Sequence, residues 1–81
     1  MASTTFQSLT EGQWSLLGAG PLLVQARSAP AWYVISDTPP AAGTIGFSLA
    51  TDERDELWTE SQVWASTSAA NGGAIMFSPI A

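Results

Sequence analysis

The chain has no cysteine, no histidine and no lysine among its 81 residues, and its only cationic side chains are Arg27 and Arg54. Histidine, cysteine and lysine supply most of the general bases and nucleophiles of enzymes, and a serine nucleophile needs such a base beside it. Disulfides are excluded, and a zinc site would lack its usual ligands. We therefore expect no enzymatic activity, no catalytic residue, no metal site and no cofactor.

Positive charge is scarce, and negative charge is gathered in one segment. The formal net charge is −5, and five of the seven acidic side chains lie within residues 52–60. Nucleic acids and anionic membranes are bound largely through clustered cations, so we expect neither as a partner. The acidic run lacks the alternating ligand pattern of a calcium loop and contains Arg54, so we interpret it as a solvated segment. Since the rest of the surface has little charge, we expect partners to cover part of it.

Apolar and polar residues alternate along several short segments, as is typical of strands with one buried face. The alternating segments are residues 22–27, 45–49, 63–68 and 74–78, and weaker strand signals lie at residues 5–9, 14–17 and 56–59. Residues 32–35 form an apolar run that suits a strand covered on both faces. Turn signals separate these segments at short intervals. This pattern predicts an all-β fold: a single small antiparallel β-sandwich or barrel, jelly-roll-like, with about six to eight short strands.

Further expectations concern local structure, domain organisation and membrane spanning. Residues 52–58 are the only place for a helix, and we interpret them as a turn or a helical crossover. The sequence Asn71-Gly-Gly73 between two alternating segments predicts a hairpin. Residues 1–81 form one domain, of which residues 1–5 are expected to be a flexible or partner-docked arm. The most apolar run, residues 16–24, is too short for a membrane span and is interrupted by glycine and proline.

Four tryptophans give the clearest functional signal. Large flat aromatic rings serve as core residues, as anchors at protein interfaces, or as platforms for sugar rings. We expect Trp32 in the core, because it starts the doubly covered apolar run. Trp58 and Trp64 are the preferred contact residues, since one follows the acidic segment and the other alternates with small apolar residues. The full set of candidate partner-binding residues is Trp58, Trp64, Trp14 and Tyr33.

Four short stretches occur in an order that resembles small virion proteins of tailed bacteriophages. They are Gly20-Pro-Leu-Leu-Val-Gln25, Val34-Ile-Ser-Asp-Thr-Pro39, Gly43-Thr-Ile-Gly-Phe-Ser-Leu49 and Val63-Trp-Ala65. The resemblance implies a β-sandwich structural subunit located in the virion after synthesis in the host cytoplasm. It further implies a head decoration (cement) protein, usually a homo-oligomer, whose partners are the major capsid protein or another virion protein. A head fibre, or a tail-associated fibre or spike that binds carbohydrate, is the alternative.

Overall fold

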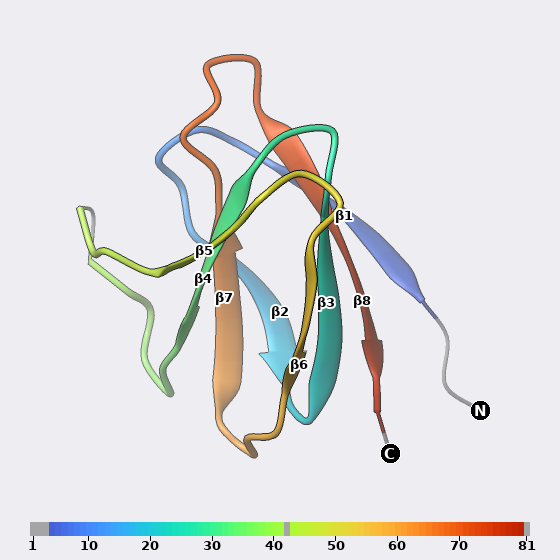
Figure 1. Ribbon diagram of the computed structural model, residues 1–81. Coiled ribbons are helices and arrows are strands. Elements are labelled where there is room, and N and C mark those ends of the chain that lie inside the picture. The colour runs from blue at the N-terminus through green and yellow to red at the C-terminus, as the bar shows by residue number, and fades with distance from the viewer. Residues whose placement is uncertain (1–3, 42, 81) are drawn as a thin grey trace.

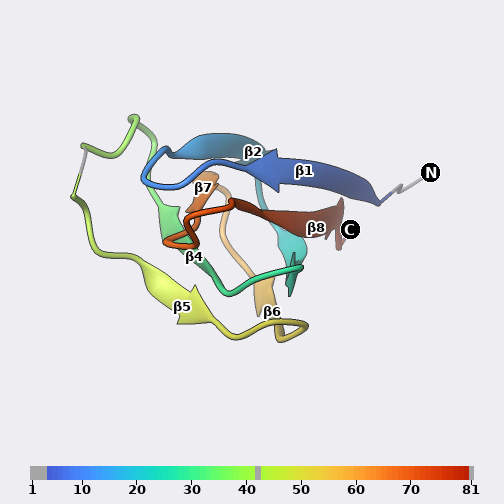
Figure 2. The same ribbon diagram turned by 90° about the horizontal axis from the view of Figure 1, so that it is seen from above.

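Eight antiparallel strands form two sheets that pack face to face (Figures 1 and 2). The computed structural model describes residues 4–41 and 43–80, and within these residues the chain forms strands and no helix. The strands are β1 (Thr5–Leu9), β2 (Ser15–Ala19), β3 (Leu22–Arg27), β4 (Ala31–Ile35), β5 (Phe47–Leu49), β6 (Arg54–Leu57), β7 (Gln62–Ser66) and β8 (Gly73–Pro79). The first sheet has the order β1-β8-β3-β6 and the second sheet the order β2-β7-β4-β5.

The strand pairing is nested from the ends of the chain towards its middle. β1 pairs with β8, β2 with β7, β3 with β6, and β4 with β5, all antiparallel. This is the order produced when one long hairpin of four strand pairs is rolled up. Additional β3–β8 and β4–β7 pairs complete the two sheets. The fold is therefore a jelly roll, and the predicted all-β sandwich is confirmed.

The core lies between the sheets and follows the predicted alternation. Leu22, Val24 and Ala26 of β3 are buried, whereas Arg27 at the end of the strand is exposed. Val63 and Ala65 of β7 are buried against them from the second sheet. Burial of a valine or leucine side chain contributes about 1.5–3 kcal/mol, so these alternating positions supply much of the drive for sheet packing.

Two segments differ from the expectation. Ile45 is 86% exposed and Phe47 is 64% exposed, because the edge strand β5 begins only at Phe47 and buries only its last residue, Leu49. Residues 54–57 form strand β6 instead of a helix or turn, since they pair with β3 and complete the first sheet. Charged side chains on such an edge strand oppose unwanted pairing with other chains. No helix within the described ranges is long and apolar enough to cross a membrane.

The predicted hairpin at Asn71 is also corrected. A turn is present there, with Gly72 at a φ of 78°, but β7 and β8 belong to different sheets and do not pair. The turn therefore carries the chain from one sheet to the other. The expected N-terminal arm falls partly on residues 1–3, which lie outside the described residues. Thr5, its last residue, starts β1 and is paired with Phe77.

Candidate functional site

Three of the four tryptophans lie on the outer face of the second sheet. Trp64 in β7 is paired with Leu16 in β2 and with Val34 in β4. Its neighbours along the strand, Val63 and Ala65, are fully buried. Side chains alternate between the two faces of a strand, so the Trp64 ring points outward together with its two apolar partners.

Trp32 points outward as well, and this corrects its expected place in the core. It is paired with Ser66 of β7 and with Ser48 of β5, and its side chain is half-buried. Trp14 lies immediately before β2 and is also half-buried. Its Cη2 atom would lie 3.0 Å from a Cβ atom placed on Gly46, so the ring reaches towards the segment before β5. We call the outward set Trp14, Leu16, Trp32, Val34, Ile45 and Trp64 the tryptophan face.

Hydrogen bonds fix the Trp64 ring at the end of β4. Its Nε1 donates to the backbone oxygen of Ser36 over 2.9 Å. The neighbouring Asp37 carboxylate accepts a bond of 3.3 Å from the backbone nitrogen of Gln62. Asp37 thus connects the end of β4 to the start of β7. These hydrogen bonds hold the Trp64 ring and the strand ends beside it in fixed positions.

A cleft of about 350 Å³ opens on the tryptophan face between Trp14, Trp32 and Ile45. Its floor includes Ser66 and Thr67, which are both buried. The Thr67 hydroxyl donates to the Pro30 backbone oxygen over 2.9 Å and accepts from the Ala69 nitrogen over 3.1 Å. Because its hydrogen-bonding capacity is used inside the fold, Thr67 supports the cleft floor and offers little to a ligand.

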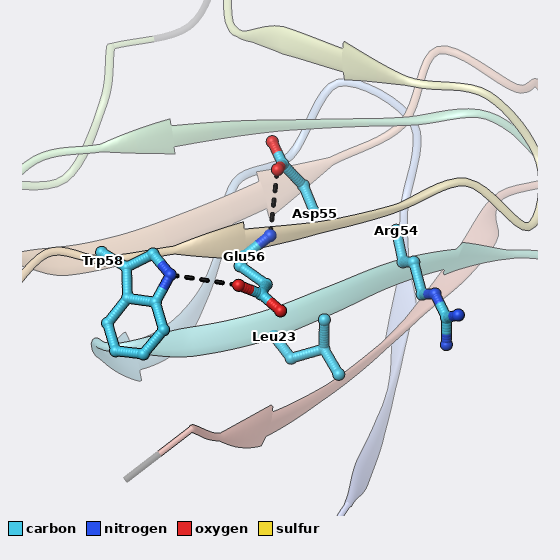
Figure 3. A pocket seen from close by; sticks show the side chains of 5 residues that line it. All are labelled: Leu23, Arg54, Asp55, Glu56 and Trp58. Atoms are coloured by element: carbon cyan, nitrogen blue, oxygen red, sulfur yellow. Dashed lines mark hydrogen bonds between the residues drawn. The ribbon is translucent and has the colours of Figure 1, made fainter.

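Trp58 lies on the other sheet and borders a separate hollow (Figure 3). It follows β6, is 66% exposed, and its Nε1 donates to the Glu56 carboxylate over 3.1 Å. The hollow measures about 650 Å³ and is lined by Leu23, Arg54, Asp55, Glu56 and Trp58; we call it the Trp58 hollow. The two preferred contact residues, Trp58 and Trp64, are therefore not brought together, because they stand on different sheets.

Tyr33, the remaining candidate, is a core residue. It is 7% exposed and points inward from β4, opposite the buried Ala65. Its hydroxyl donates to the Asp55 carboxylate over 2.8 Å. Burial of the phenol, and secondly its hydrogen bond to Asp55, raise the pKa of Tyr33 to about 12. Tyr33 therefore lies inside the sandwich and not on the surface.

Sequence reasoning missed Trp32, Ile45 and Leu16 as members of an outer face. Four consecutive apolar residues at 32–35 do not show which of them point inward. Only the burial of Ala31 and Tyr33, on either side of Trp32 in β4, resolves its direction. Ile45 and Phe47 lie two residues apart in an alternating segment, a pattern that predicts that both are buried. The short strand β5 buries neither side chain.

The tryptophan face offers a ligand mainly apolar side chains, whereas the Trp58 hollow offers both charged and apolar side chains. Over the described ranges, no group of three or more histidine, cysteine, aspartate or glutamate residues is placed to hold a metal ion. No protein-family model, no curated protein and no solved structure matches the chain.

Proposed function

We propose that the chain is a non-enzymatic structural subunit of a tailed-phage virion, a head decoration protein that binds the major capsid protein and sister copies. One observation carries the binding part of this proposal. None of the four strands of the second sheet contains a charged residue. The strands of the first sheet carry Arg27, Arg54, Asp55 and Glu56.

This asymmetry matters because a sheet with one solvated face normally shows polar residues on that face. Four outward positions of β2, β7 and β4 are apolar, namely Leu16, Trp64, Val34 and Trp32, and the polar Ser66 lies beside Trp32. Contiguous apolar patches of this kind mark interaction surfaces. Tryptophan is also enriched among interface residues that carry most of the binding energy, at about 2–4 kcal/mol each. The tryptophan face is thus suited to burial against a neighbouring protein.

The virion part of the proposal comes from the sequence resemblance. The jelly roll is compatible with it, since this fold is common in viral capsid domains, although a fold alone does not determine function. In the proposed mechanism, each copy contacts capsid subunits and sister copies through the tryptophan face. The first sheet, which carries the strand charges, faces solvent. Binding strengthens the shell by burying apolar surface, without any chemical step.

The experiment compares substitutions on the two outer faces. Leu16→Ser and Ile45→Ser change side chains that are 46% and 86% exposed on the tryptophan face. Phe6→Ser is the matched control, because Phe6 is 60% exposed and points outward from the first sheet beside Met76. Folding of each variant is checked by thermal unfolding, and binding is measured by co-sedimentation with capsids of the source phage that lack the protein.

We expect Leu16→Ser and Ile45→Ser to bind at least about tenfold more weakly, which corresponds to about 1.4 kcal/mol. Phe6→Ser should bind as the unchanged protein does. Failure of the unchanged protein to bind capsids would refute the decoration function. Equal binding by all the folded variants would refute the role of the tryptophan face.

A further inference from the structure

The edge strand β6 aligns three chemically different side chains along the outer face of the first sheet. Arg54 is paired with Gln25 and Glu56 with Leu23, whereas the intervening Asp55 is opposite the buried Val24. Arg54 and Glu56 therefore point outward. Trp58 continues the row, since its ring is hydrogen-bonded to Glu56. Figure 3 shows Trp58 and Arg54 at the two ends of the Trp58 hollow, with Glu56 and Leu23 between them.

Trp58 is held in an exposed position by a specific contact. Its side chain is 66% exposed, although removal of an indole from water is strongly favourable. The bond of 3.1 Å from Nε1 to the Glu56 carboxylate restricts the ring orientation. The bond favours one orientation of a large exposed aromatic surface, which lowers the cost of ordering it on binding.

The polar side chains around the Trp58 ring differ in how much of their hydrogen-bonding capacity is already taken up within the fold. Asp55 accepts hydrogen bonds from the Tyr33 hydroxyl and from the Glu56 nitrogen, so it serves the fold. Glu56 retains a second carboxylate oxygen besides the one that accepts from Trp58. Among the described residues, the one salt bridge joins Arg27 to Asp52 and leaves the Arg54 guanidinium outside it. The hollow therefore offers a charged donor, a charged acceptor and an apolar ring.

This combination selects among ligand classes. A phosphate-bearing or polyanionic ligand would meet one arginine within a run of acidic side chains at residues 52–56, which is unfavourable. A lipid chain would have to desolvate Arg54 and Glu56. A sugar ring has an apolar C–H face that packs on an indole and hydroxyl groups that both donate and accept hydrogen bonds. Trp58 lies four residues after Arg54, a span of about 13 Å at about 3.3 Å per residue, which suits a short oligosaccharide.

We propose that the Trp58 hollow is a binding site for neutral oligosaccharides, in which a pyranose ring stacks on Trp58 while Glu56 and Arg54 hydrogen-bond to ring hydroxyls. Leu23 supplies the apolar floor of the site. This inference goes beyond the proposed function and uses the opposite side of the sandwich. A subunit attached through the tryptophan face would leave the hollow open, so the virion could contact glycans of a cell or of its surroundings.

The test measures binding of the full-length chain to a printed array of neutral and acidic glycans, followed by calorimetric titration with the neutral oligosaccharides that bind. We expect neutral oligosaccharides to bind with millimolar or better affinity. Trp58→Ala should abolish this binding, and Glu56→Gln and Arg54→Gln should each weaken it about tenfold. Phe6→Ala, an exposed aromatic elsewhere on the same sheet, is the matched control and should bind normally.

Three results would overturn the proposal: no binding of any neutral glycan, binding of acidic glycans alone, or unchanged binding by folded Trp58→Ala. Leu16→Ser separates this outcome from that of the proposed function. It is expected to lose capsid binding and to keep saccharide binding, whereas Trp58→Ala should do the reverse.

Discussion

The hydroxyl of Tyr33 in the second sheet donates a hydrogen bond of 2.8 Å to the carboxylate of Asp55 in the first sheet. The edge strands β5 and β6 lie on the same side of the sandwich, away from β1 and β2 (Figure 2). The Tyr33 ring also lies 5.4 Å from the ring of Phe47, at an interplanar angle of 33°. Tyr33 thus joins the core to both edge strands and holds in place the strand that carries the Trp58 hollow.

Tyr33→Phe is predicted to lower the free energy of unfolding by about 1–3 kcal/mol, because a hydrogen bond to a charged group is lost. The ring and its packing are retained in this variant, so the fold should persist. Urea unfolding at neutral pH measures the difference. Phe47→Leu, which changes the neighbouring exposed ring without touching the hydrogen bond, is the control and should cost less.

Stability at alkaline pH should depend on the same residue. The pKa of Tyr33 is raised from 10.0 to about 12, so the unfolded chain loses its phenolic proton first, and stability falls as pH rises from about 10 to about 12. Below pH 10 the contribution is fully present. Tyr33 is the only tyrosine, and the chain has no lysine or cysteine, so no other side chain titrates in this interval.

Tyrosinate absorbance of the native protein should therefore show a midpoint near pH 12, and urea unfolding of Tyr33→Phe should lack the alkaline loss. A native midpoint at the ordinary tyrosine pKa, or the same alkaline loss in Tyr33→Phe, would contradict the assignment.

Thr67→Val is predicted to destabilise the fold by about 1–3 kcal/mol. The substitution keeps the shape of the side chain but leaves the Pro30 oxygen and the Ala69 nitrogen without their partner in a buried position. Thr67→Ser is the matched control, since it keeps the hydroxyl and removes only a methyl group, at a cost of about 1 kcal/mol. Thermal unfolding checks the order of stability; equal stability of the valine variant and the native protein would show that these bonds contribute nothing.

Gly46→Ala tests the position of Trp14. The new Cβ atom would lie 2.5 Å from the Tyr33 backbone oxygen and 3.0 Å from Trp14 Cη2, so the backbone at residue 46 must move and the Trp14 ring beside it must shift, at a cost of about 1–3 kcal/mol. We expect a lower unfolding midpoint and a changed tryptophan emission. Gly43→Ala is the control: no neighbouring atom lies near its Cβ position, and its φ of 85° makes the cost a backbone cost. Unchanged emission in Gly46→Ala would place Trp14 elsewhere.

The fold could be predicted largely from the sequence, because the buried positions follow a regular period. Val24 and Ala26, like Val63 and Ala65, occupy alternate positions that face one core, and this local pattern needs no knowledge of strand partners. The pairing of strands is a long-range property, so the Asn71 turn looked like a hairpin when it in fact crosses between sheets.

The candidate site is harder to predict from the sequence, because it also depends on the long-range pairing of strands. The outward direction of Trp32 follows from the burial of its neighbours Ala31 and Tyr33, and the buried Tyr33 hydroxyl finds its partner in Asp55 of the other sheet. Trp58 is exposed. This agrees with its position after the acidic segment, which favours it as a contact residue. Its polar neighbours, Arg54 and Glu56, become visible as a site only once residues 54–57 are known to form a strand.

The most direct test of the proposed decoration role is cryo-electron microscopy of virions purified from the source of the sequence, with the chain located in the reconstructed density. The account predicts ordered copies on the head, with Leu16, Trp64 and Ile45 buried against capsid protein or sister copies and with the first sheet facing solvent. Absence of the chain from the head, or copies whose tryptophan face is open to solvent, would contradict it.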